Sequence, residues 1–327
     1  MSRLSDILTN FSQENGIFAI SEPRFFLHPE ENYDAQYGFE NVDLGYHRQE
    51  GKAVLELCEQ FGYDDSAPVL EIGCGTGRLS LSLALSGRLS ELLATDPSPA
   101  FCRIISAKLS KVSPPVADTK IGILTAEDLC KLPRNSFSLI VLRSVLHHIL
   151  DIPRFFSDCA SLLKPGGLMI FEEPCYEGYV LMGAMTQFVP DVLKAKGVVL
   201  SGKHLADIQM FADTMKFYTR RDLDKSTCED KHLFRTDELM RVCQDCGMNL
   251  HMFPNRVFSD IQHRNEPLGE RYFERFYFDY VKYALSWDQD LIDIFDQHCK
   301  KYFDYFSVLV PGGAMPYTYG TFLCKKA

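Results

Sequence analysis

The sequence lacks a long uninterrupted apolar run and an excess of basic residues. No window approaches the length of a membrane-spanning helix, and no apolar stretch typical of a secretion signal follows the first residues. The 327-residue chain has 34 lysines and arginines against 44 aspartates and glutamates, a formal net charge of −10. Because a nucleic-acid-binding surface needs a basic footprint, we expect no nucleic-acid partner. From the missing apolar segments we expect a cytoplasmic protein that does not bind a membrane.

A disulfide framework and a metal-ligand pattern are also missing. The 11 cysteines are scattered and odd in number, and we expect free thiols in a reducing compartment. Cys243 and Cys246 form a CxxC pair, but no second ligand pair lies nearby. They fall in residues 236–247, which read as a capped helix that ends at a glycine. The pair is therefore interpreted as structural, and no metal is expected.

A glycine-rich turn organises the first half of the chain. Residues 69–79 read Val-Leu-Glu-Ile-Gly-Cys-Gly-Thr-Gly-Arg-Leu, an apolar run that ends near an acid and leads into an amphipathic segment. This pattern predicts a buried strand, a tight turn and a helix whose N-terminus can receive a ligand. Gly77 comes one residue early for a dinucleotide fingerprint, and Arg78 stands where that fingerprint has glycine.

Further strands and helices alternate after this turn. Apolar runs predict strands at residues 92–96, 121–125 and 136–143, and another follows the Leu-Lys-Pro-Gly-Gly turn of residues 163–167. The alternation indicates an α/β protein with a parallel sheet. Asp96 ends the second strand, where a carboxylate can accept hydrogen bonds from a ribose. The alternative is a helix N-cap, since Pro97 follows it.

The glycine turn, Asp96 and the Lys-Pro-Gly-Gly turn together resemble class I S-adenosylmethionine (SAM) dependent methyltransferases. The resemblance implies a doubly wound, seven-stranded sheet with the last strand antiparallel, helices on both faces, SAM as cofactor and S-adenosylhomocysteine as product. Thr125 replaces an aspartate common in the family, so a contact with adenine is expected from the backbone of Ala126. The residues expected at the cofactor are Glu71, Gly73, Cys74, Gly75, Gly77, Asp96, Pro97, Ala126, Glu127 and Arg143.

The rest of the chain reads as additions to this core. We expect an N-terminal helical or lid segment (1–65), the SAM-binding core (66–174), core continuations (234–260 and 311–327) and two insertions (175–233 and 261–310). The insertions would build a mainly helical cap. Aromatic residues crowd the stretch 272–283, which indicates a cap core or a face for a homodimer. No clean domain boundary is visible.

Methyl transfer is an in-line displacement, so the protein chiefly has to orient the acceptor. His147 and His148 follow the fourth strand and are the candidate bases, although such pairs also serve as packing or capping residues. Glu173, Tyr176 and Tyr179 are the candidate substrate-binding residues. The sequence therefore predicts a methyltransferase that acts on a small organic acceptor, with oxygen weakly favoured over nitrogen and carbon as the acceptor atom.

Three alternatives stay open at this point. The first is a non-catalytic protein of the same fold whose cap binds a partner. The second is a protein methyltransferase, which the acidic net charge allows. The third is an NAD(P)-dependent oxidoreductase, disfavoured by Arg78 and by the absence of a Tyr-x-x-x-Lys pair near the fifth strand.

Overall fold

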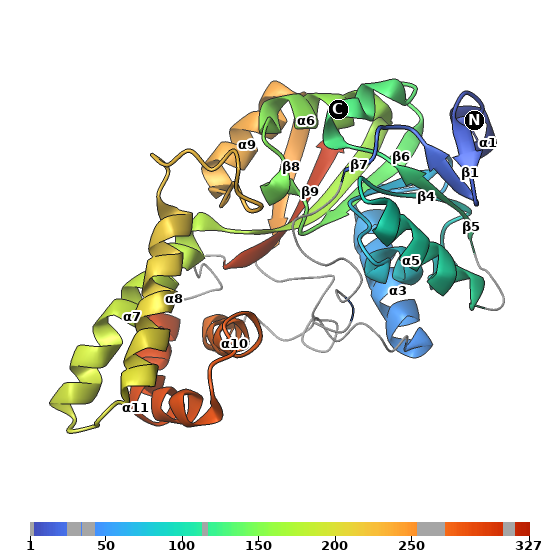
Figure 1. Ribbon diagram of the computed structural model, residues 1–327. Helices are drawn as coiled ribbons and strands as arrows, with labels where there is room; N and C mark the ends of the chain where they lie inside the picture. Colours follow the sequence, from blue (N-terminus) through green and yellow to red (C-terminus); the bar gives the residue numbers. More distant parts are fainter. Residues whose placement is uncertain (1–2, 25–33, 35–42, 113–116, 254–271, 310–317) are drawn as a thin grey trace.

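One mixed sheet forms the centre of the computed structural model, which describes residues 3–24, 34, 43–112, 117–253, 272–309 and 318–327. Within these residues the strand order is β1-β2-β5-β4-β3-β6-β7-β9-β8 (Figure 1). The strands are β1 (Ser12–Glu14), β2 (Ile17–Ala19), β3 (Val69–Ile72), β4 (Glu91–Asp96), β5 (Asp118–Ile123), β6 (Phe137–Arg143), β7 (Leu163–Pro174), β8 (Met248–Phe253) and β9 (Tyr319–Lys326).

The centre of the sheet is parallel, because helices carry the chain back between consecutive strands. β3 pairs in parallel with β4 on one side and β6 on the other, and β7 continues beside β6. β9 is antiparallel to both β7 and β8. The expected α/β class and the antiparallel last strand are confirmed. Strand order reverses at β3, so its carboxyl end is the position where open α/β sheets bind ligands.

The expected count of seven strands is wrong, because the described sheet has nine. The N-terminal segment, expected to be a helical or lid segment, contains the hairpin β1–β2, turned at Asn15 and Gly16 in the left-handed region (φ 50° and 83°). β2 then adds in parallel to β5. Each of these strands has three residues, too few for a clear alternation of apolar and polar side chains.

Helices cover both faces of the sheet, and the strands alternate their side chains between two apolar clusters. Leu70 packs with α1, α6 and α9, whereas its neighbour Val69 packs with α3 and α4. In β6, Ile140 belongs to the same cluster as Leu70, and Val141 belongs to the same cluster as Val69. The helices are α1 (Leu4–Leu8), α3 (Leu44–Gln60), α4 (Arg78–Leu85), α5 (Pro99–Ser110), α6 (Ile152–Leu162) and α9 (Thr236–Asp245), with short 3-10 turns η2 (Ala126–Lys131) and η3 (Leu146–His148).

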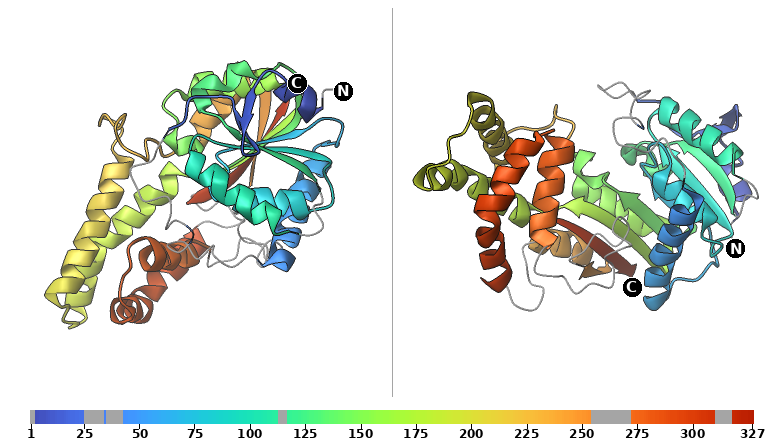
Figure 2. Two further views of the ribbon diagram at one scale, coloured as in Figure 1. Left: turned by 45° about the vertical axis from the view of Figure 1, so that its right-hand side comes forward. Right: turned by 90° about the horizontal axis from the view of Figure 1, so that it is seen from below.

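The remaining helices form a cap with its own apolar core. They are α7 (Tyr176–Ala195), α8 (Gly202–Thr219), α10 (Tyr272–Asp279), a π-helical turn (Tyr280–Ala284) and α11 (Gln289–Leu309). Both views of Figure 2 place them to one side of the sheet and its covering helices. Phe211, Tyr277 and Phe295 are fully buried among them. Buried members of the aromatic stretch therefore serve as cap core, and a dimer face stays an expectation.

Several expected segments fall partly outside the described residues. They are 1–2, 25–33 and 35–42 of the N-terminal segment, 113–116 of the core, 254–260 of one core continuation, 261–271 and 310 of the helical insertion, and 311–317 before the last strand. Among the helices described here, none has the length and apolar character needed to cross a membrane.

Candidate active site

The glycine turn after β3 has a closed side and an open side. Gly73, Gly75 and Gly77 all adopt positive φ (72°, 51° and 90°), which glycine accepts at little cost. A Cβ at Gly73 would lie 2.3 Å from Cγ2 of Val145, and one at Gly77 would lie 2.6 Å from Cγ1 of Ile105. Around Gly75 the same test meets no atom within 4 Å. The turn is therefore packed at both ends and leaves room at Gly75.

Asp96 lies beside that open glycine, at the end of β4. Its Oδ2 accepts a hydrogen bond from the Gly75 amide (2.9 Å), and its Oδ1 accepts one from the Ser98 amide (2.8 Å). The helix cap is Ser98, whose Oγ accepts from the Phe101 amide (3.2 Å), so α5 begins at Pro99 and not at Pro97. The capping alternative for Asp96 is thus taken by another residue, and the ribose contact stays a prediction.

Glu71 and Cys74 lie beneath the turn. The Glu71 carboxyl is buried and accepts from Ser80 Oγ. Burial raises the pKa of Glu71 to about 8, although the Ser80 hydrogen bond acts in the opposite direction. Cys74 packs its thiol among apolar side chains, including Ala94 and Ile105, and burial raises its pKa well above the usual value. The Glu71 and Cys74 side chains therefore pack in the protein interior next to the turn.

The other residues expected at the cofactor are spread around this edge of the sheet. The Pro97 carbonyl accepts from the Arg24 amide (2.9 Å). Ala126 opens η2, and the exposed Glu127 beside it forms an ion pair with Arg24 (3.1 Å). Arg143 ends β6 and reaches the buried Glu50 carboxylate of α3 (3.3 Å). Glu127 and Arg143 thus have protein partners in this structure.

A histidine and a glutamate meet on the neighbouring strands. Nδ1 of His147, in η3 just after β6, lies 2.5 Å from Oε2 of the fully buried Glu173 in β7. The Glu173 carboxylate also accepts from the amides of Val145 (2.8 Å) and Leu146 (2.6 Å). Burial lowers the pKa of His147, but the attraction of Glu173 outweighs it, with Asp230 adding, so the net pKa is raised. Glu173 therefore orients His147, and its expected contact with a substrate stays a prediction.

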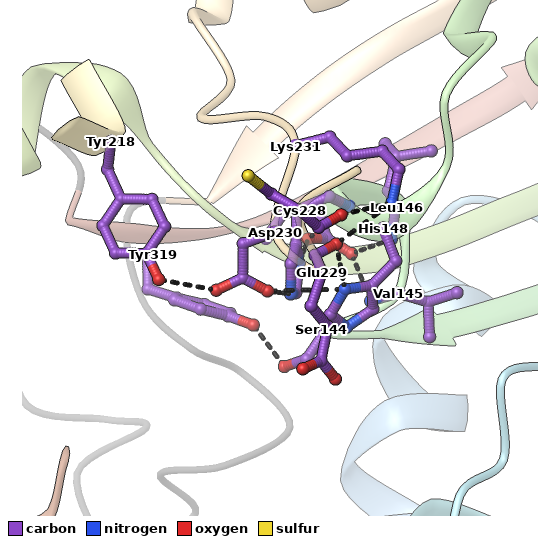
Figure 3. Close-up of polar contacts among 12 residues, drawn as sticks. Ser144, Val145, Leu146, His148, Tyr218, Cys228, Glu229, Asp230, Lys231 and Tyr319 are labelled. Atoms are coloured by element: carbon purple, nitrogen blue, oxygen red, sulfur yellow. Dashed lines mark hydrogen bonds and ion pairs between the residues drawn. The ribbon is translucent and has the colours of Figure 1, made fainter. Parts of the chain in front are cut away.

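A loop from the first insertion contacts both histidines, and Figure 3 shows its residues 228–231 beside His148. Oδ1 of Asp230 lies 3.5 Å from Nε2 of His147 and 3.4 Å from Nδ1 of His148. The Lys231 amide donates to the His147 carbonyl (2.8 Å), and Nδ1 of His148 lies 3.0 Å from the Glu229 carbonyl. Burial, followed by the neighbouring charge on His147, lowers the pKa of His148. The pKa values of the two expected bases are therefore shifted in opposite directions, upward for His147 and downward for His148.

The expected substrate residues Tyr176 and Tyr179 begin α7, next to this loop. Tyr179 is buried against the rings of Tyr218 (6.4 Å between centroids) and Tyr280 (5.9 Å), whereas Tyr176 is half-buried. The Tyr218 hydroxyl donates to Oδ2 of Asp230 (3.1 Å). Tyr218 of α8 thus links the cap to the Asp230 carboxylate that lies beside His147.

Sequence reasoning missed the site residues that come from distant segments. Asp230 carried no local signal, since it lies in a polar loop among other charged residues. Ser144 and Tyr319 are joined by a hydrogen bond between their hydroxyl groups, 175 residues apart. Ser144 also has a positive φ of 55°, which sequence does not reveal for a serine.

Comparison with known proteins agrees with this geometry. Residues 70–171 match the sequence model of a family described as "Methyltransferase domain". A ubiquinone biosynthesis O-methyltransferase of Rhizobium etli is 32% identical over 150 residues, 43% of this chain and 55% of the relative. The reducing polyketide synthase Preu2 of Preussia isomera is 31% identical over 121 residues, 36% of this chain and 5% of that protein.

Solved structures resemble the chain more distantly. The phospholethanolamine N-methyltransferase 2 of Haemonchus contortus is 17% identical, and the match covers 91% of this chain and 57% of that chain at a TM-score of 0.45. A likeness at that level does not inform on the acceptor. The chain spans about half the length of the ubiquinone biosynthesis methyltransferases that it matches. With its glycine turn and strand-end aspartate, the matched region, residues 70–171, is a methyltransferase domain of the SAM-dependent class I type.

Proposed function

We propose that the chain transfers a methyl group from SAM to a small organic acceptor, with oxygen as the favoured acceptor atom. The observation that carries this proposal is the packing of the glycine turn against the segment that holds His147. Val145, two residues before His147, occupies the space that a side chain at Gly73 would need. A cofactor at the turn and an acceptor at His147 would therefore be neighbours.

The residues at the turn fit the cofactor of this superfamily. The space beside Gly75 allows close approach to the backbone. The two Asp96 oxygens accept the amides of Gly75 and Ser98, which holds the carboxylate beside this open glycine as an acceptor of the kind that a ribose hydroxyl requires. SAM, when bound, supplies a methyl group already activated on a sulfonium. The contribution of the chain is to hold both reactants in line. Such orientation can lower the activation free energy by ~7–11 kcal/mol.

His147 is the proposed proton acceptor, through Nε2. Glu173 holds Nδ1 and stabilises the imidazolium that forms when the acceptor loses its proton, a contribution of about 10²–10⁴-fold in rate. The names of the O-methyltransferase relatives support oxygen as the acceptor atom. The cap supports a small acceptor, because a helical lobe against the site restricts access by a folded protein or a duplex.

Thermal unfolding with candidate cofactors tests the proposal. We expect SAM and S-adenosylhomocysteine at about 100 times Kd to add ~2.7 kcal/mol of stability, a rise of a few degrees in Tm. Asp96→Ala should abolish the rise, whereas Asp118→Ala, an exposed aspartate at the opposite end of the adjacent strand, should keep it. A rise with NADH or NADPH alone, or no rise with any of them, would contradict the proposal. Acceptors are then screened with methyl-labelled SAM.

A further inference from the structure

Three side chains with metal-ligating atoms meet where the insertion loop touches η3. His147, His148 and Asp230 each offer one ligand atom, and these atoms lie within 4.8 Å of one another. Oδ1 of Asp230 is 3.5 Å from His147 Nε2 and 3.4 Å from His148 Nδ1. Ligand atoms at ~2.1 Å from a tetrahedral zinc ion are about 3.4 Å apart. We propose that this cluster binds a divalent cation of the zinc class.

Groups behind the cluster hold two of its three ligands as such a site requires. Nδ1 of His147 lies against the Glu173 carboxylate, so Nε2 is the nitrogen presented to a cation. This is the carboxylate–histidine–metal arrangement that orients imidazole ligands and raises their basicity. The Tyr218 hydroxyl binds Oδ2 of Asp230, which leaves Oδ1 directed at the histidines (Figure 3). An ion pair alone does not need this ordered outer layer.

Ligand chemistry and access favour zinc over magnesium or calcium. Two imidazoles and one carboxylate match the nitrogen-rich sets of zinc, whereas magnesium and calcium prefer oxygen ligands. The side chains of His148 and Asp230 are 32% and 40% exposed, so a cation can enter from solvent. Nδ1 of His148 must release the Glu229 carbonyl and carry its proton on Nε2 instead. The positively charged Lys231 ammonium donates to the carbonyls of Cys228 and Glu229, and not to any of the three proposed ligand atoms.

Cation binding has a consequence that rests on the proposed function. There, Nε2 of His147 accepts the proton of the acceptor, and a bound cation would occupy the same lone pair. Zinc should therefore slow methyl transfer while SAM binding continues, because the glycine turn and Asp96 lie outside the cluster. A loop from the cap would in this way connect metal availability to turnover.

Calorimetric titration of the apo full-length chain with zinc chloride is the direct test. We expect one ion per chain, with affinity at least tenfold weaker in His148→Ala and Asp230→Ala and 10–100-fold weaker in Glu173→Gln. Cobalt in place of zinc should give the visible absorption of a tetrahedral site. His204→Ala is the matched control, because His204 pairs with Asp288 (3.4 Å) at a cap position outside the cluster.

Unchanged zinc affinity in both His148→Ala and Asp230→Ala, or equal loss in His204→Ala, would overturn the site. The SAM-induced rise in Tm, measured on the same variants, shows that they are folded. It also separates the two proposals, because zinc binding needs no cofactor. A chain that binds zinc but not SAM rejects the proposed function alone, and a chain that binds SAM but not zinc rejects the metal site alone.

Discussion

Single residues at the glycine turn separate packing from ligand access. Gly73 and Gly77 are closed off by Val145 and Ile105, while Gly75 has open space and contacts Asp96 through its amide. Three glycines that look alike in the sequence therefore have different reasons to be glycine. The distinction can be measured, because a methyl group added at each position meets different surroundings.

Alanine substitutions at Gly73 and Gly75 should both lower stability, but to different extents, and Gly75→Ala should act mainly on SAM binding. Gly73→Ala forces a Cβ into Val145 at positive φ and should lower apo Tm strongly. Gly75→Ala adds only the cost of a left-handed alanine, about 1–2 kcal/mol. It should nevertheless remove most of the SAM-induced rise in Tm, because its methyl enters the open space. Retention of the full rise in Gly75→Ala would place the cofactor elsewhere.

Glu71 makes a prediction about pH. Its folded-state pKa of about 8 exceeds the value of an unfolded glutamate, so its ionisation opposes folding increasingly between pH 5 and 8. Glu71→Gln removes this opposition. The variant should match the wild type at pH 5 and exceed it by about 2–4 kcal/mol at pH 8, measured by urea unfolding of the apo chain. Glu14→Gln, at an exposed carboxylate, is the control. Equal differences at both pH values would contradict the prediction.

Among the elements, the cap helices have a core separate from that of the sheet. Phe211 of α8 packs against Tyr277, Tyr280 and Trp287, with ring centroids 5.3–5.8 Å apart. None of these rings belongs to the two clusters that cover the sheet. We therefore expect that the cap can loosen without disrupting the glycine turn, and that the position of Asp230 depends on the cap through Tyr218.

Truncation of the cap core should act locally. Phe211→Ala removes a fully buried ring, at a cost of about 3–5 kcal/mol to cap stability. Hydrogen exchange should accelerate in α7 and α8 but not in β3, and the SAM-induced rise in Tm should persist while methyl transfer falls. Phe188→Ala, at a 68% exposed position on α7, should leave exchange unchanged. Equal acceleration in β3 would mean that cap and sheet unfold as one unit.

Across the whole molecule, the sheet and the cap meet at the carboxyl ends of the strands. There β3, β4, β6 and β7 deliver the glycine turn, Asp96, His147 and Glu173 to one edge, and the insertions add Asp230 and Tyr218. The parallel centre explains this convergence, since parallel strands end on the same side. The matched family region ends at residue 171, so the cap lies beyond it.

The sequence by itself determined the parts whose contacts are local. The glycine turn, the central strands and the position of His147 follow from patterns within about ten residues, where backbone preferences and side-chain periodicity act. Only the tertiary structure decided the partners of those residues. His148 meets the Glu229 carbonyl across 81 positions of the sequence, and β2 of the hairpin pairs with β5 across a still longer span, from Ile17 to Ile121. Such contacts depend on the path of the whole chain, because pairing between distant segments produces no periodic pattern of apolar and polar residues in the sequence.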